Sequence, residues 1–193
     1  MTGYISKKLN IITLLIPVLC IFSGCSDRML PANDSRLSEK GGLKYLNGNP
    51  YTGEIVTFFD GGLPESSVEY RDGKKDGTEK IWYKNGKLLA ERKYSDGKRE
   101  GIHKGWHTDG EIRFYFSFKD DRFEGENWTW YPNGQTETYS KFENGIQLGY
   151  KHWRSDGKIY MNYVMDGFER IGMYGSRLCR KAENEKDGKT VSD

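Results

Sequence analysis

Two of the three histidines, His103 and His107, lie four residues apart. On a helix this spacing would bring both imidazoles to one face, as in many zinc sites. The surrounding sequence favours a strand, along which four residues span about 13 Å, too far for one ion. Because His152 is the one further imidazole, the ligand count is also short. We therefore expect no metal, and no motif indicates another cofactor.

Carboxylates are abundant, since charged residues make up 30% of the chain. A glycosidase needs two of them within about 5–9.5 Å of each other in a cleft, and any strongly charged sheet supplies such pairs by chance. The sequence holds neither a nucleophile elbow nor a phosphate-binding glycine loop. We expect no catalytic residue and interpret the carboxylates as a solvated surface. They include Glu54, Glu65, Glu69, Glu79, Glu91 and Glu124.

Aromatic residues offer a stronger candidate site. One row keeps a constant step of 24 residues, and a further tryptophan lies close to its last member. Exposed aromatic rows can bind glycans, peptides or a partner sheet, and exposed apolar patches usually have a role. The alternative is that each ring packs on its neighbours, as period-locked residues do in repeat arrays, and we favour that alternative. The candidate binding face comprises Phe58, Trp82, Trp106, Trp128 and Trp130.

The same 24-residue step organises the glycines and a second aromatic series. A fixed period of this size is the signature of a repeat architecture. The repeats begin at Gly53, Gly77, Gly101, Gly125 and Gly149. The aromatic series that closes the repeats consists of Tyr70, Tyr94, Phe118 and Phe142.

Each period reads as a β-hairpin. In the repeat that starts at Gly77, Asn85-Gly86 and Asp96-Gly97 are strong signals for two-residue type I′ turns, which need positive φ at both central positions. Two strands and two turns per period, with no helical periodicity, predict an all-β fold. We expect an elongated single-layer antiparallel β-meander of about five tandem hairpins, wetted on both faces.

The turns also predict the register. If Lys84 pairs with Lys87, each leading glycine lies opposite the aromatic residue that closes its own repeat, and the ring would cover the bare backbone. Strand alternation then places Trp82 on the opposite face. The last repeat is one residue shorter, which would move Trp153 to the glycine face unless a bulge restores the phase.

This pattern resembles a known family. Gly77 followed by Trp82-Tyr83-Lys84-Asn85-Gly86, and Gly125 followed by Trp130-Tyr131-Pro132-Asn133-Gly134, are similar to the MORN-repeat variant over about residues 43–172. The resemblance implies an array of β-hairpins whose matching positions are structural. It also implies a label carried by bacterial members, the YwqK-type antitoxin of a toxin–antitoxin system. MORN repeats elsewhere contact proteins and membrane lipids.

The N-terminus has the form of an export signal. Lys7 and Lys8 precede an apolar run over residues 9–22 that is short for a membrane span. Ser23-Gly24-Cys25 then resembles a bacterial lipobox, which implies cleavage after residue 24 and lipidation of Cys25. The alternative is secretion with an unmodified Cys25. We expect attachment to the bacterial cell envelope, with the outer membrane favoured over the inner one because serine follows the cysteine.

The remaining organisation follows from these signals. We expect a signal peptide over 1–24, a flexible tether over 25–41, the repeat array over 42–180, and a disordered tail over 181–193. Without Lys7 and Lys8 the basic and acidic residues balance and are interleaved, which argues against nucleic-acid binding. We therefore expect a non-catalytic, membrane-anchored scaffold that binds an unidentified protein partner. The alternative is a glycan-binding surface lipoprotein that uses the tryptophan row.

Overall fold

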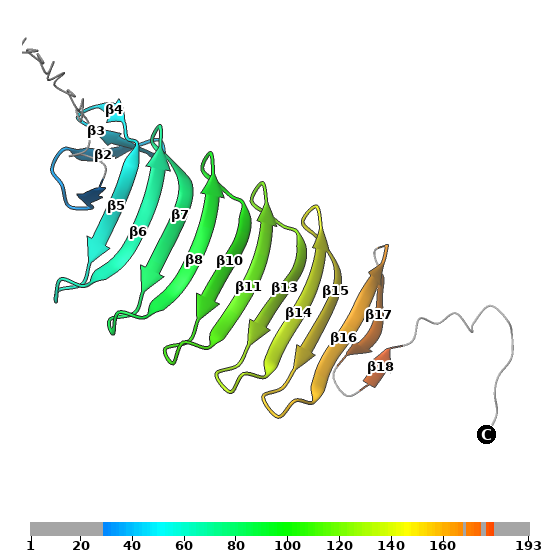
Figure 1. Cartoon of the computed structure of the whole chain (residues 1–193). Helices are drawn as coiled ribbons and strands as arrows, with labels where there is room; N and C mark the ends of the chain where they lie inside the picture. Colours follow the sequence, from blue (N-terminus) through cyan, green and yellow to red (C-terminus); the bar gives the residue numbers. More distant parts are fainter. Residues whose placement is uncertain (1–28, 168, 175–176, 180–193) are drawn as a thin grey trace, which may run out of the picture.

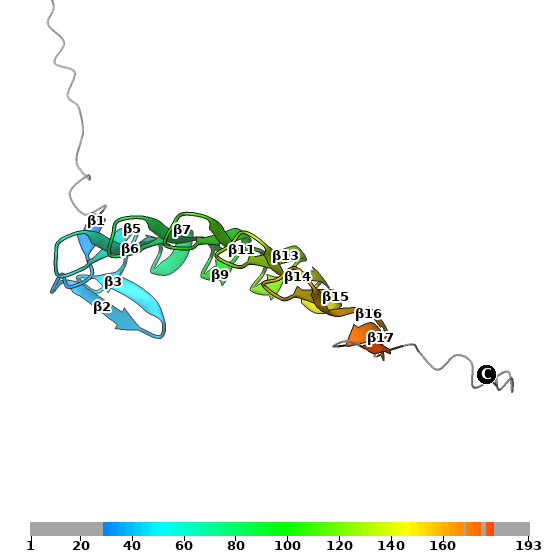
Figure 2. The ribbon, with the colours of Figure 1, turned by 90° about the horizontal axis from the view of Figure 1, so that it is seen from below.

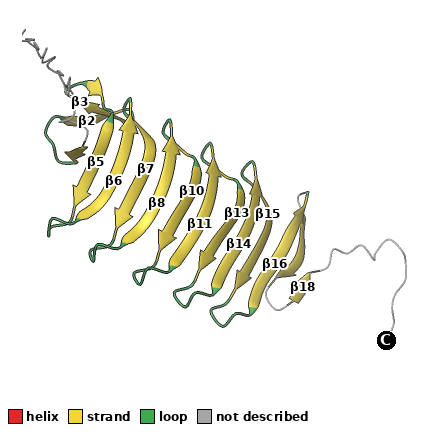
Figure 3. Ribbon diagram, in the orientation of Figure 1, coloured by secondary structure: helices red, strands yellow, loops and turns green. Residues whose placement is uncertain are grey.

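The computed structural model describes residues 29–167, 169–174 and 177–179, and these residues form two β-sheets (Figure 1). The long sheet is a single elongated layer (Figure 2). Figure 3 shows strands and loops alone in this part of the chain. The main path of the long sheet, in spatial order, is β1 (Met29–Pro31), β5 (Gly53–Phe58), β6 (Pro64–Arg71), β7 (Lys74–Trp82), β8 (Leu88–Ser95), β10 (Gly101–Trp106), β11 (Ile112–Lys119), β13 (Gly125–Trp130), β14 (Thr136–Glu143), β15 (Ile146–Trp153), β16 (Ile159–Asp166), β17 (Glu169–Tyr174) and β18 (Arg177–Cys179).

From β5 onward, neighbours along this path pair antiparallel, so the predicted meander is confirmed. Two short strands, β9 (Lys98–Arg99) and β12 (Arg122–Phe123), extend the pairing of β8 and β11 near the turns. No helix in the described ranges is long and apolar enough to cross a membrane.

The N-terminal end of the array differs from the prediction. Residues 29–41, expected to belong to a flexible tether, contain β1 and β2 (Leu37–Lys40), and β1 pairs parallel with β5. The first residues of the predicted array form β3 (Leu43–Leu46) and β4 (Asn49–Pro50), which lie outside the long sheet and form the small sheet with β2.

Burial explains why the chain is ordered there. Leu30, Tyr51 and Ile55 form a buried apolar cluster, against which Leu37 and Leu46 pack. Pairing with β1 covers the edge of β5 over residues 54–56. The expected signal peptide, Cys25 and the tail over 181–193 lie outside the described residues.

Turns of two kinds alternate along the array, where the sequence predicted type I′ turns throughout. Asp96-Gly97 and Asn144-Gly145 have positive φ at both positions, as predicted. At Asn85-Gly86 only the glycine does, and the Gly86 N–H donates to the Tyr83 carbonyl. This is a type I turn closed by a glycine bulge. The Lys87 N–H donates to the Asn85 side chain, an Asx contact that stabilises this turn.

The predicted glycine–aromatic register is confirmed despite the different turn. Trp82 lies opposite Leu88, and Ile81 lies opposite Ala90, so one bulged residue in β8 offsets the longer turn. The same compensation occurs in every hairpin that follows the pattern. The resulting pairs are Gly53 with Tyr70, Gly77 with Tyr94, Gly101 with Phe118, and Gly125 with Phe142.

The predicted reason for these pairs, a ring that covers the glycine, is wrong at Gly101 and Gly125, and the atoms nearest to a Cβ built on Gly77 belong to Glu69. No atom lies within 4 Å of a Cβ built on Gly101 or Gly125, so no ring covers these glycines. Their φ angles are 73° and 66°, in the left-handed region that glycine adopts at little cost. Backbone conformation at the start of these two hairpins therefore explains the glycine.

These glycines lie beside an irregularity that sets the period. Between consecutive hairpins two extra residues are inserted: Tyr94 pairs with Arg99, whereas Glu91, three residues away, pairs with Lys104. The joint between β14 and β15 inserts one residue, and the joint between β16 and β17 inserts none. The shorter last repeat therefore results from a smaller bulge.

The smaller bulge determines on which face of the sheet Gly149 and Trp153 lie. Gly149 pairs with Lys141, which lies opposite Glu126 on the face of Trp128. Trp153 lies four residues after Gly149 on the same strand and therefore shares its face, so it joins the other tryptophans and the expected switch of face does not occur. Gly149 is also unlike the four earlier repeat glycines, since its φ is not positive.

The core lies along the middle of the glycine face, the face that carries Gly77, Gly101 and Gly125. The residue two positions after the leading glycine is buried in four successive repeats. The expectation that both faces are wet is therefore wrong for this face. The buried series consists of Ile55, Glu79, His103 and Asn127.

Candidate binding face

The candidate tryptophans lie on the opposite side of the sheet, which we call the tryptophan face. Trp82, Trp106 and Trp130 are half-buried, whereas Phe58 is 51% exposed. Each is the last residue of its strand, β7, β10, β13 or β5. The strand positions follow from the hairpin, whose turn begins at the next residue.

Backbone carbonyls of the row accept hydrogen bonds from side chains of the preceding repeat. The Tyr83 hydroxyl donates to the Trp106 carbonyl at 2.8 Å, and the Tyr131 hydroxyl donates to the Trp153 carbonyl at 2.9 Å. His107 makes the equivalent contact through Nε2 with the Trp130 carbonyl at 2.9 Å. The backbone carbonyls at these positions are thus part of the inter-repeat framework, and the packing of the rings on their neighbours stays a prediction.

The indole rings keep unused hydrogen-bonding capacity. No side-chain hydrogen bond in the described part of the chain involves the indole N–H of Trp82, Trp106, Trp128 or Trp130. A buried tryptophan N–H normally finds an acceptor, and one that remains accessible suits a wet surface or an interface. The tryptophan face therefore presents donors that the fold itself does not use.

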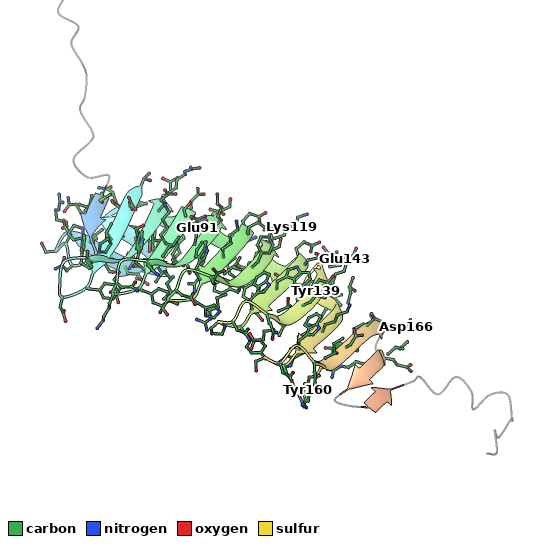
Figure 4. All side chains as sticks on the ribbon, turned by 60° about the horizontal axis from the view of Figure 1, so that its bottom comes forward. Glu91, Lys119, Tyr139, Glu143, Tyr160 and Asp166 are labelled. Atoms are coloured by element: carbon green, nitrogen blue, oxygen red, sulfur yellow. The ribbon has the colours of Figure 1, made fainter. Side chains whose placement is uncertain are left out.

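Aromatic rings gather most densely on β11, β13 and β14. The Trp128 ring centroid lies 4.4 Å from that of Tyr139 and 6.2 Å from that of Trp130. An open groove of about 460 Å³ runs beside them, lined by Trp128, Trp130, Tyr115, Glu126, Ile102 and Ser117. Figure 4 shows Tyr139 near the middle of the sheet, with side chains standing on both faces.

The histidines do not form a metal site. His103 is buried at 3% exposure, its Nε2 donates to the Lys93 carbonyl, and its ring lies 4.6 Å from that of Phe118. Burial lowers the pKa of His103, so the ring is neutral near pH 7. His107 follows the end of β10 in the turn. Within the described residues no group of three potential ligands could hold an ion.

Glu79 is the most constrained carboxylate in the described structure. It is 6% exposed and accepts hydrogen bonds from Lys75 at 2.6 Å, Arg92 at 3.0 Å and Tyr94 at 3.2 Å. Desolvation acts to raise the pKa of Glu79, but the hydrogen bonds and charges of Lys75 and Arg92 outweigh it and lower the pKa. This arrangement stabilises a fixed carboxylate and provides no proton donor.

A second set of polar side chains caps turns in the neighbouring repeat. Each member precedes a repeat glycine and accepts from the backbone N–H twenty residues later, at 2.7–3.1 Å. Sequence reasoning missed this role, although the 24-residue step of the set was visible. The set consists of Thr52, Asp76, Glu100 and Glu124.

One carboxylate pair does lie in a groove. Glu54 and Glu69 are directly opposite on β5 and β6, in a depression of about 520 Å³ that Asp76 also lines. Glu69 Oε2 accepts the Thr78 N–H at 2.7 Å, and Asp76 holds both Arg71 and the Asp96 N–H. Of the three carboxylates, Glu69 and Asp76 are engaged by these contacts and Glu54 is not. The groove therefore does not present two carboxylates available for catalysis.

Comparisons with known proteins leave the family open. No protein-family model matches the chain, and no curated protein matches it. Among solved structures it is similar to the GtfA/B complex bound to UDP and GlcNAc, with 11% identity and a TM-score of 0.23. The match covers 64% of this chain and 22% of that chain. A likeness at this level carries no argument about fold or function.

Proposed function

We propose that the chain is a non-catalytic repeat scaffold, anchored to the bacterial cell envelope through lipidated Cys25, that binds a partner protein on its tryptophan face. One observation supports a protein partner. Of the buried side-chain polar atoms on the glycine face, only Asn127 Nδ2 lacks a hydrogen bond in the described structure, whereas the indole N–H groups of Trp82, Trp106 and Trp130 on the opposite face all lack a partner among the described residues. Trp is enriched at protein interfaces because its apolar body carries a donor.

Charge on the same face supports a protein partner. Lys80, Glu91 and Lys104 are consecutive directly paired residues across β7, β8 and β10. Alternating signs of this kind fix the orientation of a partner more than they add affinity. Assignment to the MORN-repeat variant belongs to this proposal. The antitoxin label enters it only in the general sense of binding another protein.

Photo-crosslinking in the native cell tests the partner. A photoreactive residue at Lys80 or Lys93, both on the tryptophan face, should give one discrete adduct. The same residue at Glu111, exposed at a hairpin tip, should give none. Trp82→Ala should weaken the adduct. Equal adducts from Glu111, or no adduct from Lys80 and Lys93, would contradict the proposal.

Processing tests the anchor separately. Globomycin should cause an unprocessed precursor to accumulate, and Cys25→Ser should abolish labelling by a radioactive fatty acid. A soluble, normally processed product in treated cells would overturn the anchor and leave the crosslinking result intact.

Glycan binding is the second candidate. The observation that favours it is the local concentration of rings around Trp128. The groove beside Trp128 combines aromatic walls with the polar side chains of Ser117 and Glu126, as carbohydrate recognition requires.

A further inference from the structure

A single line of directly paired residues crosses the tryptophan face from β10 to β15. Lys104 pairs with Tyr115, Tyr115 with Trp128, Trp128 with Tyr139, and Tyr139 with Lys151. At about 4.8 Å per strand, the three aromatic residues span about 10 Å and the two lysines lie about 19 Å apart. The line is an aromatic strip with a cation at each end.

The repeat framework does not require these rings. At the strand position of Trp128, one, two and three periods earlier, the chain has Lys104, Lys80 and Val56. The hairpins form equally well with these smaller or charged residues, and the inter-repeat hydrogen bonds are made elsewhere. The period therefore explains Trp130 but not Trp128.

Tyr139 departs from the pattern in the same way. One, two and three periods earlier its position holds Tyr115, Glu91 and Ser67. On β11, β13 and β14, aromatic residues therefore occupy directly paired positions that hold other residue types in most of the earlier repeats. An accumulation that the repeat does not demand indicates a site.

Polar groups accompany the strip. The Tyr139 hydroxyl donates to Glu126 Oε1 at 3.2 Å, which fixes that carboxylate at the edge of the groove. The Tyr115 hydroxyl and the indole N–H of Trp128 make no hydrogen bond within the described structure. Lys104 Nζ lies 5.9 Å from the centre of the Tyr115 ring, and Lys151 is exposed.

We propose that this strip binds an acidic glycan chain running across the strands. The C–H face of a pyranose stacks on aromatic rings, and its hydroxyls match the free donors and the Glu126 acceptor. A pyranose repeats along a β-linked chain at a distance similar to the strand spacing, so consecutive sugars can contact consecutive strands. Carboxylate or phosphate substituents at the ends of the bound segment would reach Lys104 and Lys151.

The test measures binding of β-1,4-linked hexamannuronate and of β-1,4-linked mannohexaose, as acidic and neutral probes of equal length and linkage, to the mature chain by calorimetry. We expect the acidic probe to bind and the neutral probe to bind at least fivefold more weakly. Trp128→Val and Tyr139→Ser use residues found at equivalent positions in earlier repeats, so they preserve the framework. Each should weaken binding at least fivefold without a change in melting temperature.

Two further variants complete the design. Glu111→Gln, at the exposed tip of a hairpin outside the strip, should leave glycan affinity unchanged. Lys104→Gln with Lys151→Gln should weaken the acidic probe about tenfold at low salt, with a smaller difference at high salt because screening reduces the wild-type attraction. Equal affinity for both probes, no binding of either, or insensitivity to Trp128→Val would overturn the proposal. None of these outcomes depends on the crosslinking at Lys80.

Discussion

At the scale of single residues, one buried position of the repeat holds an apolar, an acidic, an imidazole and an amide side chain in four successive repeats. Ile55, Glu79, His103 and Asn127 occupy equivalent buried sites on the glycine face. Each polar member finds its own local partners: Glu79 binds Lys75 and Arg92, His103 donates to a carbonyl, and Asn127 accepts the Ser117 N–H at 2.7 Å. The position demands burial, and its polar members bond to whichever groups lie nearby, which explains why no common residue type marks it. The match is incomplete at Asn127, whose buried Nδ2 has no hydrogen-bond partner among the described residues.

Glu79 should make stability depend on pH. Its folded pKa lies below the ordinary value of 4.5, so its ion pairs stabilise the fold above that pH and are lost as pH falls through the folded pKa. The unfolding free energy of the wild type, measured by urea titration, should decline below about pH 4.5. Glu79→Gln should cost roughly 2 kcal/mol at pH 7, because two partly exposed cations lose their partner, and should flatten the decline. An unchanged acid slope would contradict this role.

Gly105 should tolerate no side chain. A Cβ there would lie 2.1 Å from Cε1 of Phe114, whose ring covers this backbone. Gly105→Ala forces the ring to move, and overpacking of this kind costs about 1–3 kcal/mol. Gly61→Ala is the matched control, since no atom lies within 4 Å of its Cβ position. Thermal unfolding should separate the two variants, and equal melting temperatures would refute the assignment.

At the scale of elements, the joints between hairpins hold the array together. The joints before Gly77, Gly101 and Gly125 each insert two residues, and the glycine of positive φ lies at their end. The residue before that glycine caps the next type I′ turn, and Lys74 and Lys98 add ion pairs to Asp96 and Asp120. These exposed pairs add little stability, but they align the turns.

The short strand β1 should act as a cap for the sheet. Leu30 is 4% exposed in the cluster beneath β5, whereas its neighbour Met29 is 61% exposed. Leu30→Ala should cost about 2–3 kcal/mol through the cavity it leaves, and should uncover an edge that promotes association. Denaturant titration and light scattering test both effects. Met29→Ala should change neither the unfolding free energy nor the association. An equal loss of stability in the two variants would show that β1 does not act as a cap.

At the scale of the whole molecule, the array is a chain of nearest-neighbour contacts. Strands that pair in the sheet are mostly neighbours in chain order as well. Hydrogen bonds from side chains to other strands and turns reach mainly into the adjacent repeat. The stability of such an array is a sum of repeat and interface contributions. A local perturbation should therefore stay local.

Tyr131→Phe tests this locality. The variant removes the hydroxyl that donates to the Trp153 carbonyl, a contact worth about 1 kcal/mol, and Phe59 already stands at the equivalent position of the first repeat. Amide hydrogen exchange should accelerate about fivefold in β15 and β16 and remain unchanged in β5–β7. Tyr83→Phe should shift the effect toward β10. Uniform acceleration along the sheet would indicate global cooperativity instead.

The sequence by itself determined the period, the strands and the glycine–aromatic register. These features depend on interactions between residues close in the chain: turn residues with positive φ, alternation along a strand, and hairpins of fixed length. Even the wrong turn type at Asn85-Gly86 left the register correct, because the bulge at Leu89 compensates for one residue.

The tertiary structure decided what lies between repeats. Contacts across 20–24 residues selected which carboxylates cap turns, buried Glu79 and His103, and folded residues 29–41 onto the first hairpin. Such contacts depend on how each bulge turns one hairpin against the next, which no local pattern specifies. For the same reason, only the assembled sheet distinguishes Trp130, whose carbonyl bonds to His107 of the preceding repeat, from Trp128, which pairs with Tyr115 and Tyr139 on the strands to either side.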